Sequence, residues 1–149
     1  MLGRLRPIGL SEFGLKEAIE NLVAFWRRRR PEICYEVMIS RQCEDFGDLL
    51  ATTICRVVQE ALSNAVRHAG PSHVAISIEH DRDEIRVAVN DDGPGMQEQS
   101  KLSYGLVGIQ ERVSAIGGRL TFSTKLGEGF AVIAALPVVI SATATTAEA

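Results

Sequence analysis

Cysteine is scarce in this sequence, and its few cysteines follow neither a metal-binding nor a disulfide pattern. Only three occur among the 149 residues: Cys34, Cys43 and Cys55. Their number is odd, no two form a C-x-x-C pair, and no cluster of cysteine and histidine has zinc-ligand spacing. We therefore expect packed, reduced thiols and a cytoplasmic protein, because disulfides persist mainly in oxidising compartments.

Long hydrophobic runs and an excess of positive charge are also missing. The longest apolar run, residues 130–140, is interrupted by Pro137 and is too short to span a bilayer. The first seven residues contain no apolar stretch of signal-peptide length. The chain has 16 lysines and arginines against 19 aspartates and glutamates, so its formal net charge is −3. This balance predicts no nucleic-acid partner, and the lack of a long apolar run predicts no direct contact with a membrane.

What remains is the composition of an ordinary globular domain. Hydrophobic residues make up 46% of the chain and charged residues 23%, which is typical of one folded domain rather than a disordered or fibrous chain. The one conspicuous charge run, residues 27–30, consists of four arginines and directly precedes Pro31. Because cations stabilise a helix C-terminus and no aromatic residues interleave the run, we interpret it as the end of a helix.

The periodicity of the apolar residues predicts an α+β fold. A spacing of three to four residues predicts helices over residues 15–30 and 46–69, and a third helix that contains Leu106 and ends at Gly117. Alternation predicts an edge strand and two hairpins, namely residues 33–39, 74–78 with 85–89, and 120–124 with 130–136. Helices and hairpins that do not alternate one for one favour a mixed sheet with helices packed on one face.

The first candidate site lies on the second predicted helix, on the polar side that carries Arg56, Glu60, Ser63, Asn64 and Arg67. Glu60 and Asn64 are four residues apart, so they lie one above the other. A carboxylate and an amide oxygen arranged in this way can share Mg²⁺, which prefers oxygen ligands. Arg67 and the adjacent His68 follow one turn later, where they can meet phosphate oxygens. A solvated helix face is the alternative interpretation.

The second candidate site is the segment Asp91–Gly95, directly after a predicted strand. Glu98 occupies the third glycine position of a Rossmann fingerprint, and the sequence contains no Walker P-loop. What remains is a carboxylate, Asp91, that can accept a hydrogen bond from an exocyclic amine such as that of adenine. Gly93 and Gly95 allow the backbone to approach a flat ligand closely. A simple turn is the alternative interpretation.

The third candidate site is the glycine-spaced segment of residues 104–109, which opens the third helix. Its Gly105, Leu106 and Gly108 can offer backbone N–H groups at a helix N-terminus, where phosphates bind. Close packing of this helix against its neighbour is an equally good interpretation. Taken together, the three sites supply what binding of a magnesium–nucleotide complex without a P-loop requires.

At these three sites the sequence resembles the GHKL ATPases. Residues 57–69 (VVQEALSNAVRHA) resemble the N box in the form found in bacterial sensor histidine kinases, and residues 91–95 (DDGPG) resemble the G1 box. Residues 104–118 resemble the G2 box of the subfamily that signals to NarL-type response regulators. Residues 5–15 resemble the segment that joins the dimerisation helices of that subfamily to the catalytic domain. The resemblance runs from about Leu5 to Pro137 in the expected order and spacing.

The resemblance implies a Bergerat-type two-layer α/β sandwich that binds ATP and Mg²⁺. Asp91 would hold the adenine amino group, with Gly93 and Gly95 shaping its pocket. Asn64 and Glu60 would be the metal-binding pair, and Glu60 would act as the catalytic residue near the γ-phosphate. Further contacts with the phosphates would come from Arg67, His68, Lys101 in a short lid, and the backbone of Gly105, Leu106 and Gly108.

The resemblance also implies a division of the chain and a set of partners. Residues 1–14 would be the end of a dimerisation helix and a linker, residues 15–138 the ATP-binding catalytic domain, and residues 139–149 a disordered tail. The γ-phosphoryl would pass to a histidine on a dimerisation helix of the parent kinase, and then to a NarL-type response regulator. Because His68, His73 and His80 all lack the Glu-Leu-His-Asp-like context of the family's acceptor, we expect that the chain does not autophosphorylate alone. Without the dimerisation helices, we expect it to be a monomer.

Two alternatives from other classes stay open at this point. One is a GHKL anti-sigma-type serine kinase. Segments 5–7 and 105–112 disfavour it. The other is a nucleotide-sensing module without phosphotransfer, which the presence of both Glu60 and Asn64 disfavours. Phe130 departs from the threonine that many relatives carry after Gly-x-Gly.

Overall fold

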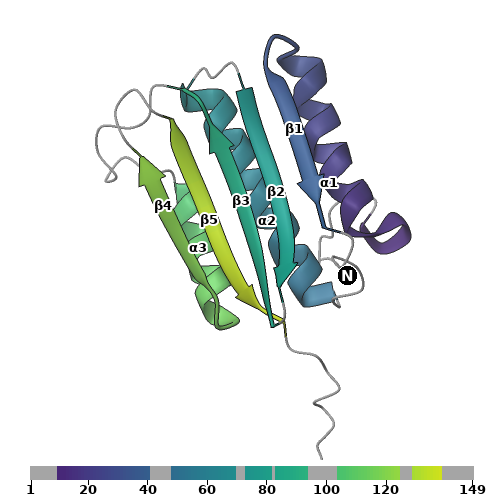
Figure 1. Cartoon of the computed structure of the whole chain (residues 1–149), viewed down its shortest axis with the longest axis vertical. Helices are drawn as coiled ribbons and strands as arrows, with labels where there is room; N and C mark the ends of the chain where they lie inside the picture. Colours follow the sequence, from purple (N-terminus) through teal and green to yellow (C-terminus); the bar gives the residue numbers. More distant parts are fainter. Residues whose placement is uncertain are drawn as a thin grey trace, which may run out of the picture.

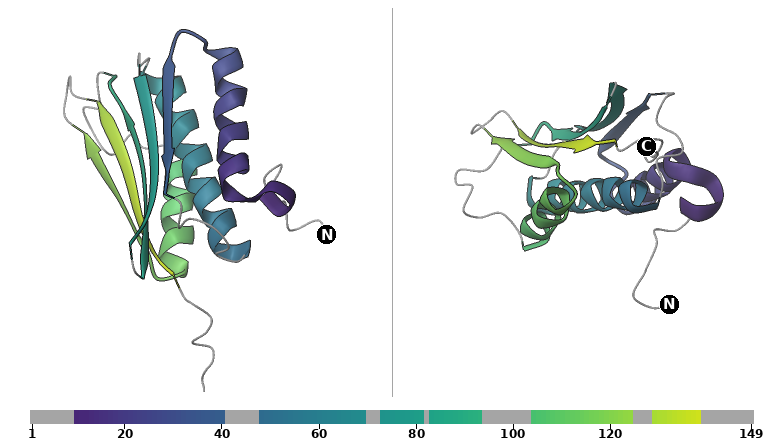
Figure 2. Two further views of the ribbon diagram at one scale, coloured as in Figure 1. Left: turned by 45° about the vertical axis from the view of Figure 1, so that its right-hand side comes forward. Right: turned by 90° about the horizontal axis from the view of Figure 1, so that it is seen from below.

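The helices in the described part of the chain cover the same face of one five-stranded sheet (Figures 1 and 2). The computed structural model describes residues 10–40, 48–69, 73–81, 83–93, 104–124 and 129–138. The helical elements are α1 (Leu10–Arg29), α2 (Asp48–Asn64), the π-helix η1 (Ala65–Ala69) and α3 (Tyr104–Ala115). The strands are β1 (Cys34–Ile39), β2 (His73–Asp81), β3 (Glu84–Asp91), β4 (Arg119–Thr124) and β5 (Phe130–Pro137).

The sheet is mixed, with the strand order β1-β2-β3-β5-β4. Strand β1 forms one edge, as predicted, and pairs in parallel with β2, to which α2 and η1 connect it. The remaining pairs, β2 with β3, β3 with β5, and β5 with β4, are antiparallel. The prediction of an α+β fold with a mixed sheet and helices on one face is therefore confirmed.

The core lies between the sheet and the helices. Alternate residues of β2, β3 and β5 are buried, including Ile76, Val87 and Val132, because successive side chains of a strand point to opposite faces. From the helical layer, Ile54 and Leu62 of α2 are fully buried. Helix α2 is the central helix and packs against both α1 and α3. It is therefore held on three sides, by two helices and the sheet.

Two helices differ from the sequence prediction. The first begins at Leu10 rather than at residue 15 and is interrupted at Gly14, whose φ of 87° and ψ of −179° are not helical. The second keeps α geometry only to Asn64 and continues as the π-helix η1. Periodicity predicts neither feature, because a glycine kink and a π turn barely change the spacing of buried positions.

Several sequence predictions fall outside the described residues. These include residues 1–9 of the predicted linker over residues 1–14, the tail over residues 139–149, Gly95 and Lys101. Within the described ranges, no helix combines the length and the apolar character needed to cross a membrane.

Candidate nucleotide site

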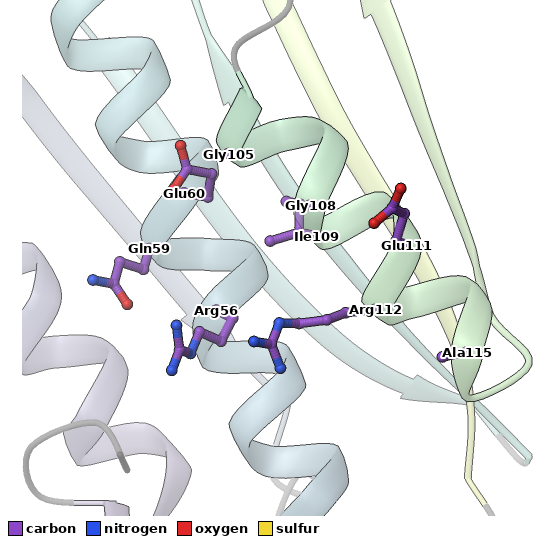
Figure 3. Close-up of a pocket in the computed structure, with 9 residues that line it drawn as sticks. All are labelled: Arg56, Gln59, Glu60, Gly105, Gly108, Ile109, Glu111, Arg112 and Ala115. Carbon is purple, nitrogen blue, oxygen red and sulfur yellow. The ribbon is translucent and has the colours of Figure 1, made fainter. Parts of the chain in front are cut away.

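The carboxylate of Glu60 lies against the first turn of α3. Gly105 is the second residue of that helix, and a Cβ atom added to it would collide with the Glu60 carboxylate. Figure 3 shows the Glu60 side chain directed toward Gly105. Glycine thus makes room for a carboxylate at a helix N-terminus, where the helix dipole favours negative charge. The contact brings the first and third candidate sites together.

Asn64 occupies the last turn of α2 and is buried, which corrects the prediction that it lies on the polar face. Only 2% of the residue is exposed, whereas Arg67 is exposed. The cause is the central position of α2, because α1 and α3 cover the flanks that would face solvent on an outer helix. Arg56, Glu60 and Ser63 remain partly exposed.

The Oδ1 atom of Asn64 is buried and has no hydrogen-bond partner among the described residues. An unsatisfied buried acceptor costs about 1–3 kcal/mol, so the position favours a donor or a cation that would satisfy it. With the carboxylate of Glu60 one turn away on the same helix, the available ligands are oxygens. This donor set fits Mg²⁺, which takes one or two protein oxygens and completes its shell with phosphate and water.

Asp91 is the last residue of β3, and its carboxylate is held by backbone N–H groups. The residue is 8% exposed, and its Oδ1 accepts a hydrogen bond of 2.8 Å from the N–H of Gly93. Burial raises the pKa of Asp91, while the N–H groups of Gly93 and Phe130 oppose the rise and Asp92 adds to it. Gly93 itself is buried. A buried acceptor at a strand end is what recognition of an exocyclic amine requires.

The topology places Asp91 at the same end of the molecule as Asn64. Helix η1 ends at Ala69, β2 begins at His73, and the next residue, Val74, pairs with Asp91. A hydrogen bond also links the two segments here, because the main-chain N–H of His73 donates to the side-chain carboxylate of Asp92 at 2.9 Å. The ends of α2 and β3 and the start of α3 therefore converge on one region.

The remaining predicted residues are only partly tested by the structure. The Leu106 side chain is fully buried, so it can contribute to this region only through its backbone. Gly108 is exposed, and a Cβ atom added there would meet nothing within 4 Å. His68 lies in η1, but its side chain is outside the described part of the structure, as are Gly95 and Lys101.

A groove of about 590 Å³ runs between α2 and α3 from the contact of Glu60 with Gly105 (Figure 3). It is lined by Arg56, Gln59, Glu60, Gly105, Gly108, Ile109, Glu111, Arg112 and Ala115. Sequence analysis did not single out Gln59 or Arg112 in this role. Their only signal is position, because Gln59 is next to Glu60 in the sequence and Arg112 follows Gly108 by about one helical turn. That signal is too weak to identify a groove in advance.

Two further residues that the sequence did not point to contact the segments that carry Asp91 and Asn64. Gly129 has a φ of 91°, and a Cβ atom there would collide with the carbonyl oxygen of Asp91. Arg30 donates from Nη1 to the carbonyl oxygen of Val66 in η1 at 3.2 Å, which ties the end of α1 to the end of α2. The sequence suggested only a hairpin turn for Gly129 and only a helix end for Arg30.

Comparison with known families identifies this arrangement. Residues 50–140 match the sequence profile of the histidine kinase-, DNA gyrase B- and HSP90-like ATPases. The chain belongs to this family. Domains of this ATPase family bind ATP, and the prediction of a GHKL catalytic domain of the sensor-kinase type is confirmed.

Similar curated proteins are sensor kinases. The chain is 32% identical over 136 residues to the signal transduction histidine-protein kinase/phosphatase DegS of Brevibacillus brevis, covering 90% of this chain and 35% of DegS. It is 33% identical over 144 residues to the sensor histidine kinase LiaS of Bacillus subtilis, covering 93% of this chain and 38% of LiaS. The chain thus spans little more than a third of the length of these relatives.

Solved structures share the fold of this ATPase-family chain. The histidine kinase domain of a blue-light activated histidine kinase from Erythrobacter litoralis superposes with a TM-score of 0.72 at 23% identity, over 91% of this chain and 64% of that one. The mycobacterial sensor histidine kinase MprB gives a TM-score of 0.64 at 23% identity, over 83% of this chain and 93% of that one.

Proposed function

We propose that this chain is the catalytic domain of a sensor histidine kinase that binds Mg–ATP and donates the γ-phosphoryl to a histidine of a separate dimerisation helix. The observation that carries the proposal is the buried Oδ1 of Asn64, which no described residue satisfies with a hydrogen bond. It lies one helical turn from a carboxylate placed against the first turn of α3. Family membership and the sensor kinases among its relatives support the same function.

In this proposal each described residue has one task. The carboxylate of Asp91 accepts a hydrogen bond from the adenine amino group, and Gly93 holds that carboxylate in place through its N–H. Asn64 and Glu60 supply the oxygens that would hold Mg²⁺, which when bound neutralises phosphate charge. Gly105, Leu106 and Gly108 offer backbone at a helix N-terminus to the phosphates. Arg67, His68 and Lys101 are proposed to contact the phosphates, and Gly95 to shape the adenine pocket.

Glu60 is the proposed catalytic residue. Its carboxylate lies at the helix N-terminus that would receive the phosphates, so it can accept a proton or orient the attacking imidazole as the phosphoryl leaves ATP. The acceptor histidine would come from the dimerisation helices of the parent kinase, and a NarL-type response regulator would receive the phosphoryl next. Residues 1–14, 15–138 and 139–149 keep their proposed roles as linker, catalytic domain and tail.

The first experiment is calorimetric titration of the chain with ADP and ATP, with and without Mg²⁺. We expect Mg²⁺ to strengthen ATP binding and Asp91→Asn to abolish it. Asp92→Asn is the matched control, because it removes the adjacent exposed carboxylate and should retain binding. Loss of binding in both variants, or in neither, would contradict the assignment of Asp91.

The second experiment supplies the missing acceptor. The chain is mixed with dimerisation helices from a relative such as DegS, then incubated with Mg–ATP and examined for acid-labile phosphohistidine. We expect a signal on the added helices and none on the chain alone. Transfer to serine of an added protein instead would show that the chain is a serine kinase of the GHKL type. ATP binding without any transfer would indicate a sensing module.

A further inference from the structure

The arginine run at the end of α1 divides into two parts. Arg30 is turned toward the protein, because it forms an ion pair with Glu32 and donates to the carbonyl oxygen of Val66. The other three arginines, residues 27–29, are exposed, and none of them forms an ion pair with a residue that the structure describes. The helix dipole explains why cations are favoured at this position. It provides no acceptor for their N–H groups, so three guanidinium groups within one helical turn are available to an anionic partner.

Two of these three arginines stack on aromatic rings. The guanidinium carbon of Arg29 lies 4.4 Å from the centre of the Phe25 ring, and that of Arg27 lies 5.8 Å from the centre of the Tyr35 ring. Both distances are within the range of cation–π contacts. Stacking uses the flat face of a guanidinium and leaves the N–H groups at its edge available for phosphate oxygens. The run itself contains no aromatic residue, so only the structure shows this arrangement.

An exposed aromatic side chain accompanies the arginines. Phe25 is 41% exposed, and its ring contacts that of Trp26 at right angles, with the ring centres 5.2 Å apart. Trp26 is partly buried against the core. Aromatic rings beside cations are typical of surfaces that lie at the boundary between lipid headgroups and acyl chains. We call residues 25–29 the α1 tip.

The α1 tip concentrates positive charge at one corner of the molecule. Figures 1 and 2 show α1 at the outer edge of the helical layer, so its C-terminal end is open to large partners. Four of the chain's 16 basic residues lie in the run 27–30, whereas the whole chain has a net charge of −3. The rest of the chain therefore carries an excess of acidic residues. A large anionic surface would be attracted to this corner and repelled by the remainder of the molecule.

These features favour a lipid surface over a nucleic acid as the occupant. A base that stacked on Phe25 would have to displace Arg29 from one face of the ring. The α1 tip extends over only about 6 Å of helix, which is too short to follow a nucleic-acid backbone. A lipid surface requires neither, because its headgroups can gather around a few cations. The lack of a long apolar run, from which the sequence predicts no membrane contact, does not exclude peripheral contact of this kind.

We propose that the α1 tip is a peripheral docking site for an anionic lipid surface. The three exposed arginines bind lipid phosphates, and the Phe25 ring enters the boundary with the acyl chains beside Trp26. Arg30 joins the end of α1 to η1, so this contact turns the end of the domain that carries Asn64 toward the bilayer. The proposal is independent of the proposed kinase function, because it requires neither nucleotide nor phosphotransfer.

The test uses the fluorescence of Trp26, which is the single tryptophan of the chain and lies in the α1 tip. The full chain is titrated with vesicles that mix phosphatidylglycerol and phosphatidylcholine, and with vesicles of phosphatidylcholine alone. We expect a blue shift of the emission with the anionic vesicles only. Lipids brominated near the start of their acyl chains should quench the emission, and added salt should weaken binding. An unchanged emission with anionic vesicles would overturn the proposal.

Two variants separate the contribution of charge from that of the aromatic ring. Each arginine near an anionic surface strengthens binding by about fivefold, so Arg27→Gln/Arg28→Gln/Arg29→Gln should weaken vesicle binding on the order of 100-fold. Phe25→Ser should keep the salt dependence of binding and reduce the quenching by brominated lipids. Circular dichroism checks that both variants are folded.

The matched control is Arg86→Gln/Arg112→Gln/Arg119→Gln, which removes three exposed arginines from β3, α3 and β4. It should keep most of the affinity for anionic vesicles. An equal loss in this control would show that overall charge rather than the α1 tip determines binding, and would overturn the proposal. Tighter binding of a labelled oligonucleotide or of polyglutamate than of the vesicles would show a nucleic-acid or acidic-protein site, and would overturn it also.

Discussion

At the scale of single residues, the surroundings of Asp91 determine how nucleotide binding depends on pH. Burial raises the pKa of this carboxyl above its ordinary value of 3.8. Only the ionised form is purely an acceptor, so ADP should bind more weakly as the pH falls through the raised pKa. By linkage, ADP should lower the pKa of Asp91. The measurement is an NMR titration of the Asp91 carboxyl carbon with and without ADP, and an unchanged pKa would contradict adenine recognition there.

The same pKa shift has the opposite consequence for stability. Because the folded pKa lies above the unfolded one, the folded chain binds more protons between the two values, and the free energy of unfolding falls as the pH rises through this window. At pH 7 the ionised carboxylate therefore costs stability. Asp91→Asn should leave the free energy of unfolding unchanged or raise it while removing nucleotide binding, so the loss of binding in that variant is not a folding defect.

Gly105 and Gly108 provide a matched pair in one helix. Alanine at either position gains up to about 1 kcal/mol of helix propensity over glycine. Gly108→Ala meets nothing within 4 Å and should realise this gain in chemical denaturation. Gly105→Ala must displace the Glu60 carboxylate, so it should gain less stability and lose most phosphotransfer to added dimerisation helices. Normal transfer by Gly105→Ala would show that the position of Glu60 against α3 is unimportant.

At the scale of secondary-structure elements, the β4–β5 hairpin is held against the end of β3 by Gly129. Both Gly129 and Gly117 have positive φ, at 91° and 86°, but only at Gly129 would a Cβ atom collide with backbone, at Asp91. Gly117→Ala should therefore cost about 1–3 kcal/mol of strain, and Gly129→Ala clearly more. Urea unfolding of the two variants checks the difference. Equal costs would mean that β5 moves freely away from Asp91.

The elements also show why sequence analysis placed the helices and hairpins but not their partners. Alternation along β2, β3 and β5 predicted strands because one face of each is buried. Nothing in the residues of β1 specified parallel pairing with β2, or the position of β5 between β3 and β4. The pairing of β1 and the position of β5 depend on how all the elements pack together to bury the core. The burial of Asn64 was missed for the same reason, since it follows from the neighbours of α2 rather than from its sequence.

The candidate site was predictable as three motifs and not as one geometry. Glu60, Asp91 and Gly105 were each chosen from local spacing and resemblance. The structure brings Glu60 and Gly105 into contact. The contact of Gly129 with Asp91 and the hydrogen bond from Arg30 to Val66 join segments far apart in the chain. Such contacts leave no local periodicity, so a single sequence does not reveal them.

At the scale of the whole molecule, nucleotide should stabilise the folded chain by mass action. A ligand at about 100 times its Kd adds about 2.7 kcal/mol to the free energy of unfolding, which for a chain of this length raises the Tm by roughly 5–11 °C. We expect this shift with Mg–ATP in calorimetric scans, a smaller one with ATP and EDTA, and none in Asp91→Asn. An equal shift in Asp91→Asn would place the nucleotide elsewhere on the protein.

The unpartnered oxygen of Asn64 also has a meaning for inhibitor design. A compound that delivers an N–H or O–H group to this oxygen replaces no hydrogen bond from the described residues, so nearly the whole penalty of about 1–3 kcal/mol becomes affinity. That gain corresponds to roughly a 5- to 150-fold lower Kd. A methyl group in the same place would gain no affinity from Asn64 Oδ1, because it cannot donate a hydrogen bond. Matched compounds that differ only in this donor would therefore measure how much free energy the protein loses at that single atom when no ligand is bound.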